Sequence, residues 1–372
     1  MRKRIDGSQL SVLVFVAVMA LKIFMAPGLL IKYAGRDGWI GMAIYVAFEL
    51  LILLMILFII KLNKKSLYEV LCDSLGKVIA KVILAVFCVL LFIKLIMMCG
   101  EVELFFTTSM LNSIKYVVCF IFLLMLLVFF CYKGLTPLSR MAQIFFPFVL
   151  AALGILFLLT IQNLDLRGLM PITADGAEIA TNMAMFPMWF GDVAVLLGLT
   201  GKVKQRKRLV LKGMLTGGIS GAIVMYFAIV LFAAYGDYPV IIDYGHNISN
   251  MVVYSSGSYL FGRFDIPIFC ILMISIFVQI ALTFFTITQF CGDIVERGSS
   301  VVWAIAVAII LFIMSQFVFN NKTELFNLGT SWPRWLCLAI EIILPVLVLV
   351  VSIINKRRTK NENDVQTQNS DS

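Results

Sequence analysis

Five charged side chains fall inside long apolar stretches of the sequence: Lys22, Glu49, Lys94, Asp192 and Glu341. A charged group in the hydrocarbon interior of a bilayer costs about 2.5–3.5 kcal/mol or more, so such groups are rare and often functional. Two ammonium groups and three carboxylates can pair with each other. They can also bind the charged ends of a small zwitterion, and an ammonium group can occupy the place of a coupling cation. These residues therefore indicate ligand or ion binding within a membrane.

Two of the charges adjoin a proline and a glycine. Lys22 precedes Pro27 and Gly28, and Asp192 ends the run Phe186-Pro187-Met-Trp189-Phe190-Gly191-Asp192. Proline removes an amide donor and clashes with the preceding turn of a helix, so both segments are predicted to be kinked or unwound. Their freed backbone groups must then face protein, water or a ligand, because lipid cannot satisfy them. A simple kink is the alternative, and it is our interpretation of Pro147 and Pro345.

The predicted ligand site lies at these two interruptions and on one neighbouring stretch. Lys22 could meet a ligand carboxylate or occupy the place of a coupling cation, and Asp192 could meet an ammonium group. Structural ion pairing or snorkelling is the alternative, which we favour for Glu103 and Glu341. Lys94 is seven residues from Glu101 and shares a helix face with it. The predicted substrate-binding residues are Lys22, Phe24, Ala26, Pro27, Lys94, Pro187, Trp189, Phe190, Gly191 and Asp192.

Other kinds of chemistry have little support in the sequence. His246 is the only histidine, so a histidine-based metal site or catalytic triad is not expected. The eight cysteines are scattered singly and are interpreted as small apolar filler. We therefore predict no catalytic residue, no metal and no cofactor.

The composition identifies the elements that must hold these charges. Apolar residues make up 62% of the 372 residues and charged residues 14%, whereas soluble domains have roughly 45–50% and about 25%. A helix needs about 20 apolar residues to cross the hydrocarbon. The chain has ten such stretches: 10–31, 39–60, 82–106, 116–131, 142–161, 182–201, 213–234, 266–290, 301–319 and 332–354. An all-α integral membrane protein with ten transmembrane helices is predicted.

Positive charge predicts the orientation of these helices. With the N-terminus inside, 21 Lys and Arg residues face the cytoplasm and 7 face outward, which places both termini in the cytoplasm. The net charge of +9 is then explained by membrane anchoring. The basic segment 202–212 is accordingly assigned to contact with anionic lipid and not with nucleic acid. Residues 355–372 are polar and are predicted to be a disordered cytoplasmic tail.

The ten stretches divide into two halves of five. Many secondary transporters are built from two inverted repeats, each containing a helix that is interrupted at mid-membrane where the ligand binds. The two candidate interruptions open the two halves here. We predict a single membrane domain over residues 1–354, with repeats at about 8–162 and 180–354 and with broken helices 1 and 6.

Several short motifs resemble one known group of proteins. Ala34-Gly35-Arg36-Asp37-Gly38-Trp39 is similar to its A-G-x-D-x-W turn, and the run Lys133 to Arg140 is similar to its G-x-x-x-x-x-R entry into span 5. Asn163 to Pro171 is similar to its N-L-x-x-L-x-P loop. The chain thus resembles the permease-like B subunit of spore germinant receptors, the GerAB/GerKB-like spore permease family.

This resemblance implies an amino acid–polyamine–organocation superfamily member with a five-plus-five LeuT-like fold. It implies a place in the spore inner membrane or the bacterial cell membrane. The expected partners are the lipid bilayer, an A-type membrane subunit, a C-type lipoprotein and a small nutrient, commonly an amino acid. Lys22 stands where the family's first span often has a glycine-containing break.

Two functions remain open at this point. A nutrient sensor would bind its ligand between spans 1 and 6 and shift between conformations. An amino-acid/cation symporter would use the same architecture for alternating access. A channel is permitted by the embedded charges but not required by them, and an integral-membrane enzyme is not expected.

Overall fold

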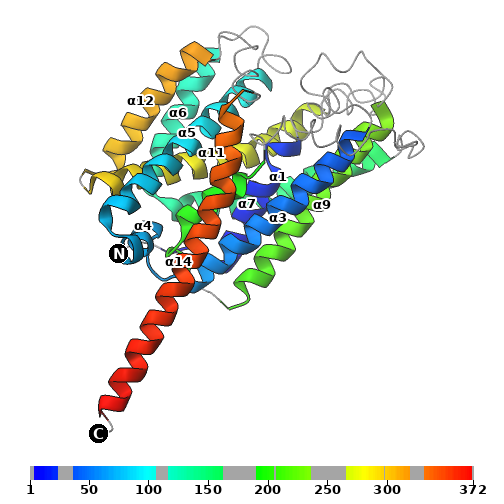
Figure 1. Cartoon of the computed structure of the whole chain (residues 1–372). Helices are drawn as coiled ribbons and strands as arrows, with labels where there is room; N and C mark the ends of the chain where they lie inside the picture. Colours follow the sequence, from blue (N-terminus) through cyan, green and yellow to red (C-terminus); the bar gives the residue numbers. More distant parts are fainter. Residues whose placement is uncertain are drawn as a thin grey trace, which may run out of the picture.

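The computed structural model of the 372-residue chain describes residues 4–23, 37–105, 116–161, 190–204, 207–235, 265–296, 298–318 and 331–370. Almost all of these residues are helical (Figure 1). Within the described ranges, the extended structure is an isolated parallel bridge between Ile5 and Val203. An all-α fold was predicted and is confirmed.

The helices follow the apolar stretches of the sequence. The first half contains α1 Gly7–Met19, α3 Gly38–Leu62, α4 Leu67–Leu75, α5 Lys77–Phe105, α6 Tyr116–Lys133 and α7 Leu135–Ile161. The second half contains the 3-10 helix η5 Asp192–Leu199, then α9 Leu209–Tyr235, α11 Asp265–Val295, α12 Ser300–Val318 and α14 Pro333–Ser370. Each of the ten predicted stretches overlaps one of these elements.

Seven of the described helices are long and apolar enough to cross a membrane: α3, α5, α7, α9, α11, α12 and α14. Two further apolar helices, α1 and α6, are shorter in their described parts. Large apolar side chains such as Val78 and Phe317 stay exposed on the outside, as expected of a surface that faces lipid. The chain is thus a multi-pass membrane protein, while the exact number of ten spans stays a prediction.

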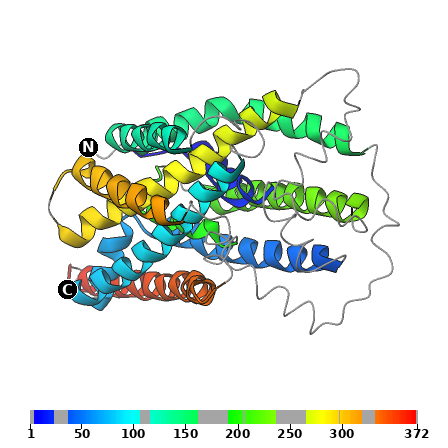
Figure 2. The same cartoon turned by 90° about the horizontal axis from the view of Figure 1, so that it is seen from above.

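α11 lies at the centre of the helix packing. It contacts α5, α7 and α12, and also reaches α1 and η5. On the other flank α1, α3 and α9 lie side by side, and the view from above separates this group from α6 and α12 (Figures 1 and 2). The short element η5 contacts α1, α3, α11 and α14, so it is enclosed by helices from both halves of the chain.

Backbone contacts close one end of this arrangement. Ile5 N donates to Lys202 O and Lys204 N donates to Ile5 O, each at 2.9 Å, which ties the start of the chain to the segment after η5. The amphipathic helix α4 begins nearby with a capping box, in which Glu69 N donates to Ser66 Oγ at 3.3 Å and Ser66 N donates to Glu69 Oε2 at 2.8 Å. The ten predicted stretches did not include α4.

The end of the chain differs from the expectation of a disordered tail. α14 continues past residue 354 to Ser370 and projects away from the other helices (Figure 1). Extension of an existing helix avoids the cost of nucleation, and the Lys, Arg, Glu and Gln residues in this segment have good helix propensity. A polar composition alone therefore does not decide between helix and coil here.

Candidate functional site

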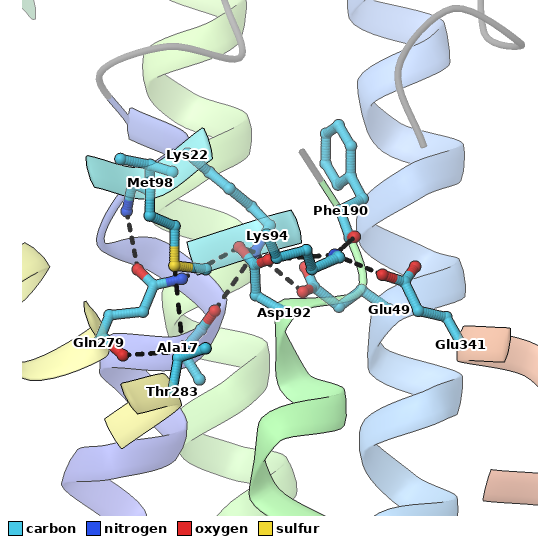
Figure 3. A network of polar contacts seen from close by, with 11 residues as sticks. Ala17, Lys22, Glu49, Lys94, Met98, Phe190, Asp192, Gln279, Thr283 and Glu341 are labelled. Atoms are coloured by element: carbon cyan, nitrogen blue, oxygen red, sulfur yellow. Dashed lines mark hydrogen bonds and ion pairs between the residues drawn. The ribbon is translucent and has the colours of Figure 1, made fainter. Parts of the chain in front are cut away.

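The five buried charges come together in the middle of the molecule. Lys22 follows α1, Glu49 lies on α3, Lys94 on α5, Asp192 begins η5 and Glu341 lies on α14 (Figure 3). Each of these residues has an exposed fraction of 4% or less. We call this set, Lys22, Glu49, Lys94, Asp192 and Glu341, the central cluster. It is assembled from five elements, so it depends on the tertiary fold.

The charges alternate in sign along the central cluster. Lys22 Nζ lies 2.9 Å from Glu49 Oε1 and 3.4 Å from Asp192 Oδ2. Lys94 Nζ lies 3.2 Å from Asp192 Oδ1 and also pairs with Glu341 Oε1. The order is therefore carboxylate, ammonium, carboxylate, ammonium, carboxylate, with Asp192 bridging the two lysines (Figure 3).

Asp192 is held in place by the way its segment folds. Gly191 has φ +81° and ψ 9°, a left-handed conformation, and η5 begins directly after it. The eight residues of η5 are all buried. A 3-10 helix of this length is uncommon, because its hydrogen bonds are poorer than those of an α-helix, and such stretches often mark a hinge or a functional site. From α11, Gln279 Nε2 donates to Asp192 Oδ2 at 3.0 Å.

Two independent features favour glycine at position 191. Its positive φ is costly for residues that carry a Cβ. In addition, a Cβ built on Gly191 would overlap the carboxylate of Glu341. The neighbouring Phe190 accepts a hydrogen bond from Lys94 through its carbonyl oxygen, and its ring stacks on Tyr45 with centroids 4.3 Å apart. The backbone around Gly191 is therefore fitted closely to the central cluster.

Lys22 and Gln279 complete the backbone hydrogen bonding where α1 ends. Lys22 Nζ donates to Ala17 O at 3.3 Å, and Leu21 N donates to Gln279 Oε1 at 3.2 Å. The last carbonyl groups of a helix lack intrahelical donors and carry a partial negative charge. The ammonium group of Lys22 thus lies where a cation is favoured, between the carbonyl end of α1 and two carboxylates.

A second polar region lies toward one end of the helices. A cavity of about 850 Å³ is bordered by the start of α4, the junction of α6 and α7, and the last turns of α11. Lys202 lines it, with its Nζ 4.6 Å from the ring centroid of Phe285 and in contact with Gln289 Oε1. We call this the end cavity. No residue of the central cluster lines it, although α11 contributes to both regions.

The structure brings together half of the predicted site residues. Lys22, Lys94, Phe190, Gly191 and Asp192 meet around the central cluster. The other predicted residues, Phe24, Ala26, Pro27, Pro187 and Trp189, lie outside the described residues. The predicted interruptions of helices 1 and 6 therefore stay predictions, since most of each lies in the same undescribed segments.

Three residues of the site were not predicted. The sequence marks Glu49 as a buried charge without indicating its role, and it favours a structural role for Glu341. Gln279 is an uncharged amide in the apolar stretch of α11, and the sequence signal for it is a polar pair with Thr283, four residues further along. Lys94 shares a helix face with Glu101, but its ion pairs are with Asp192 and Glu341.

The chain that carries this arrangement matches a known protein family. A family model described as spore germination protein, the spore permease family, matches residues 4–324. The chain belongs to this family. Spore permeases and the structural neighbours are permeases and transporters and not enzymes, in agreement with the prediction. No curated protein matches the chain by sequence.

Solved transporter structures share the fold of this spore permease. A substrate-bound, outward-open Na⁺-coupled sialic acid symporter superposes with a TM-score of 0.63 at 14% identity, over 88% of this chain and 79% of the symporter. A nucleobase-cation-symport-1 family transporter, closed with bromovinylhydantoin bound, gives 0.61 at 13% identity, over 88% and 75%. A mutant of the Eremococcus coleocola manganese transporter gives 0.60 at 10% identity, over 92% and 78%. The fold is thus that of LeuT-type transporters.

Proposed function

We propose that this spore permease is the permease-like subunit of a nutrient germinant receptor and that it binds a small nutrient, an amino acid, at the central cluster. The observation that supports this proposal is the alternating row of buried charges at the junction of α1 and η5. A free amino acid carries an ammonium and a carboxylate group. Each of these groups can replace one internal partner in a row of alternating charges.

Ligand binding would then act by exchanging ion pairs. Asp192 bridges Lys22 and Lys94, which reach it from α1 and α5. A ligand carboxylate that takes over one lysine, or a ligand ammonium that takes over Asp192, loosens the connection between these elements. Because a ligand shifts an equilibrium only by its differential affinity for two states, this exchange supplies the required difference.

The surroundings of the protein belong to the same proposal. The subunit lies in the spore inner membrane or the bacterial cell membrane with both termini cytoplasmic. It consists of two inverted repeats of five spans that open with broken helices 1 and 6. An A-type membrane subunit and a C-type lipoprotein are its partners, as the family resemblance implies.

Germination in a strain whose only intact receptor contains this subunit tests the proposal. Lys22→Ala and Asp192→Asn are compared with Lys65→Ala and Asp73→Asn, since Lys65 and Asp73 form an exposed ion pair on the surface. We expect the first two variants to lose the response to amino acids at normal protein levels and the second two to retain it. An unchanged response in both central variants would contradict the assigned site.

An amino-acid/cation symporter is the alternative, favoured by the fold shared with a Na⁺-coupled symporter. Uptake of labelled amino acids into proteoliposomes that contain only the purified protein distinguishes the two functions. Accumulation that depends on an ion gradient would establish transport. Binding without accumulation would support a sensor.

A further inference from the structure

The central cluster contains one carboxylate more than it contains ammonium groups. Lys22 and Lys94 stand against Glu49, Asp192 and Glu341, so the cluster has a formal charge of −1 when all five groups are ionised. The five side chains are almost completely buried. A net charge that has been taken out of water is unfavourable unless an opposite charge accompanies it. The geometry therefore calls for one further positive charge.

Glu49 is the carboxylate with room for that charge. Its Oε1 pairs with Lys22, but its Oε2 is buried and has no hydrogen-bond partner among the described residues. Asp192, by contrast, accepts hydrogen bonds on both of its oxygens, from Lys22 and Gln279 on one and from Lys94 on the other.

Among the described residues, the charges that act on Glu49 come from four elements: Lys22 after α1, Lys94 on α5, Asp192 on η5 and Glu341 on α14. Among the described elements, α9 also packs extensively on α3, and it carries no acidic residue and a single lysine, Lys212, near its start. α9 therefore brings no additional lysine or arginine to Glu49. No cation from α9 balances the formal negative charge of the central cluster.

The missing charge fits a proton better than a metal ion. An ammonium group stands between each neighbouring pair of carboxylates, so the carboxylates do not converge on one point. Within the described ranges, no three acidic, histidine or cysteine side chains are grouped closely enough to hold a metal ion. Protonation needs a single oxygen. We propose that Glu49 binds a proton that neutralises the central cluster.

This proton site gives the ligand a partner for exchange. An ammonium group that enters a neutral cluster without a carboxylate adds one positive charge, and release of one proton from Glu49 restores neutrality. A zwitterionic amino acid adds no net charge, so the exchange is between the proton and an ammonium group that reaches the cluster on its own. This exchange rests on the proposed function, because it assumes that the ligand binds at the central cluster. Occupancy by the proton alone does not depend on any ligand.

Infrared spectroscopy of the purified full chain in lipid nanodiscs tests the proton site without a ligand. A protonated carboxyl group has a C=O stretch that is distinct from that of a carboxylate. We expect this band in the wild type at neutral pH in choline chloride, its loss in Glu49→Gln, and its retention in the matched control Glu103→Gln. Absence of the band from the wild type, or its survival in Glu49→Gln, would overturn the proposal.

Two additions complete the experiment. Replacement of choline by Na⁺ should leave the band in place, and its disappearance would assign the missing charge to Na⁺ and overturn the proton site. Methylammonium, the simplest ammonium probe, should reduce the band as its concentration rises. If the band persists, exchange is refuted while the proton site stands. The wild-type measurements require no variant to fold, and their outcome is independent of the germination assay.

Discussion

The central cluster and the end cavity use the same chemistry in opposite surroundings. Both contain lysine and carboxylate side chains, and α11 contributes to both. The lysine–carboxylate pairs of the central cluster have side chains that are 1–3% exposed, whereas Lys81 and Glu296 near the end cavity are 34% and 44% exposed. Buried pairs depend on each other, because water cannot replace a lost partner. Exposed pairs contribute about 0–1 kcal/mol, because water can replace a lost partner there.

Removal of a buried lysine should give the largest effect in this comparison. Lys94→Met leaves Asp192 and Glu341 without their shared ammonium group and removes one of the two positive charges of the central cluster. Breaking a buried ion pair costs about 3–5 kcal/mol, since an uncompensated charge remains. We expect a sharply lower thermal midpoint in detergent, or no monodisperse protein.

Lys65→Met is the control for that substitution. Lys65 pairs with Asp73, but the two side chains are 61% and 45% exposed, so the same change of residue type should cost at most about 1 kcal/mol. Equal shifts of the thermal midpoint in Lys94→Met and Lys65→Met would show that burial does not separate the two regions.

The helices and the buried charges could be predicted from the sequence, but the ion pairs between the charges could not. Apolar runs predicted the helical stretches, and the same runs made Lys22, Glu49, Lys94, Asp192 and Glu341 stand out. Which charge pairs with which was not predictable. Glu49 and Glu341 are far apart along the chain, and their positions beside the two lysines follow from how α3 and α14 pack.

Two other misses have physical causes of their own. Gln279 is uncharged, so hydropathy gives little sign of its role in holding Asp192. The polar segment after residue 354 has a composition compatible with both coil and helix, and α14 extends through it. In both cases the deciding factor is the tertiary or helical context and not the residue type.

A methyl group at Gly191 tests how closely the backbone fits the central cluster. Gly191→Ala forces a Cβ into a left-handed conformation and against the carboxylate of Glu341. Strain of this kind costs about 1–3 kcal/mol. The matched control is Gly154→Ala in α7, where a Cβ would meet nothing within 4 Å. The control should be neutral, or stabilising by up to about 1 kcal/mol, because alanine favours a helix.

Thermal midpoints of the two glycine variants decide this point. A lowered midpoint in Gly191→Ala alone would confirm the close fit between the segment before η5 and α14. Similar midpoints for Gly191→Ala and Gly154→Ala would mean that Glu341 can move aside at little cost, and the central cluster would then be less rigid than its contacts indicate.

Neutralising a carboxylate should cost less than removing a lysine. Glu341→Gln keeps the shape of the side chain and removes one of the three carboxylates, and loss of the proton proposed for Glu49 can keep the central cluster neutral, so we expect a loss of stability of about 1 kcal/mol. The comparison with Lys94→Met uses two ends of one ion pair. A pair whose two partners were equally important would give equal shifts, which would contradict the charge imbalance on which the proton site at Glu49 depends.

The smallest effect is expected from acid at the edge of the end cavity. Tyr68 donates a hydrogen bond to Glu296 Oε1 at 2.6 Å and Lys81 Nζ lies 3.2 Å from the same atom, and together they hold the pKa of the Glu296 carboxyl below its usual range. A lowered pKa in the folded protein stabilises it above the pKa of the unfolded chain, about 4.3 for glutamate. That contribution is lost as the pH falls through the lower folded value.

The thermal midpoint of Glu296→Gln should therefore lie slightly below that of the wild type at neutral pH, with a difference that shrinks as the pH falls below about 4. Measurement of both proteins between neutral pH and pH 3 gives this difference directly. A difference that stayed constant into acid would show that Glu296 acts through packing and not through its charge. The two regions would then differ in more than their access to water.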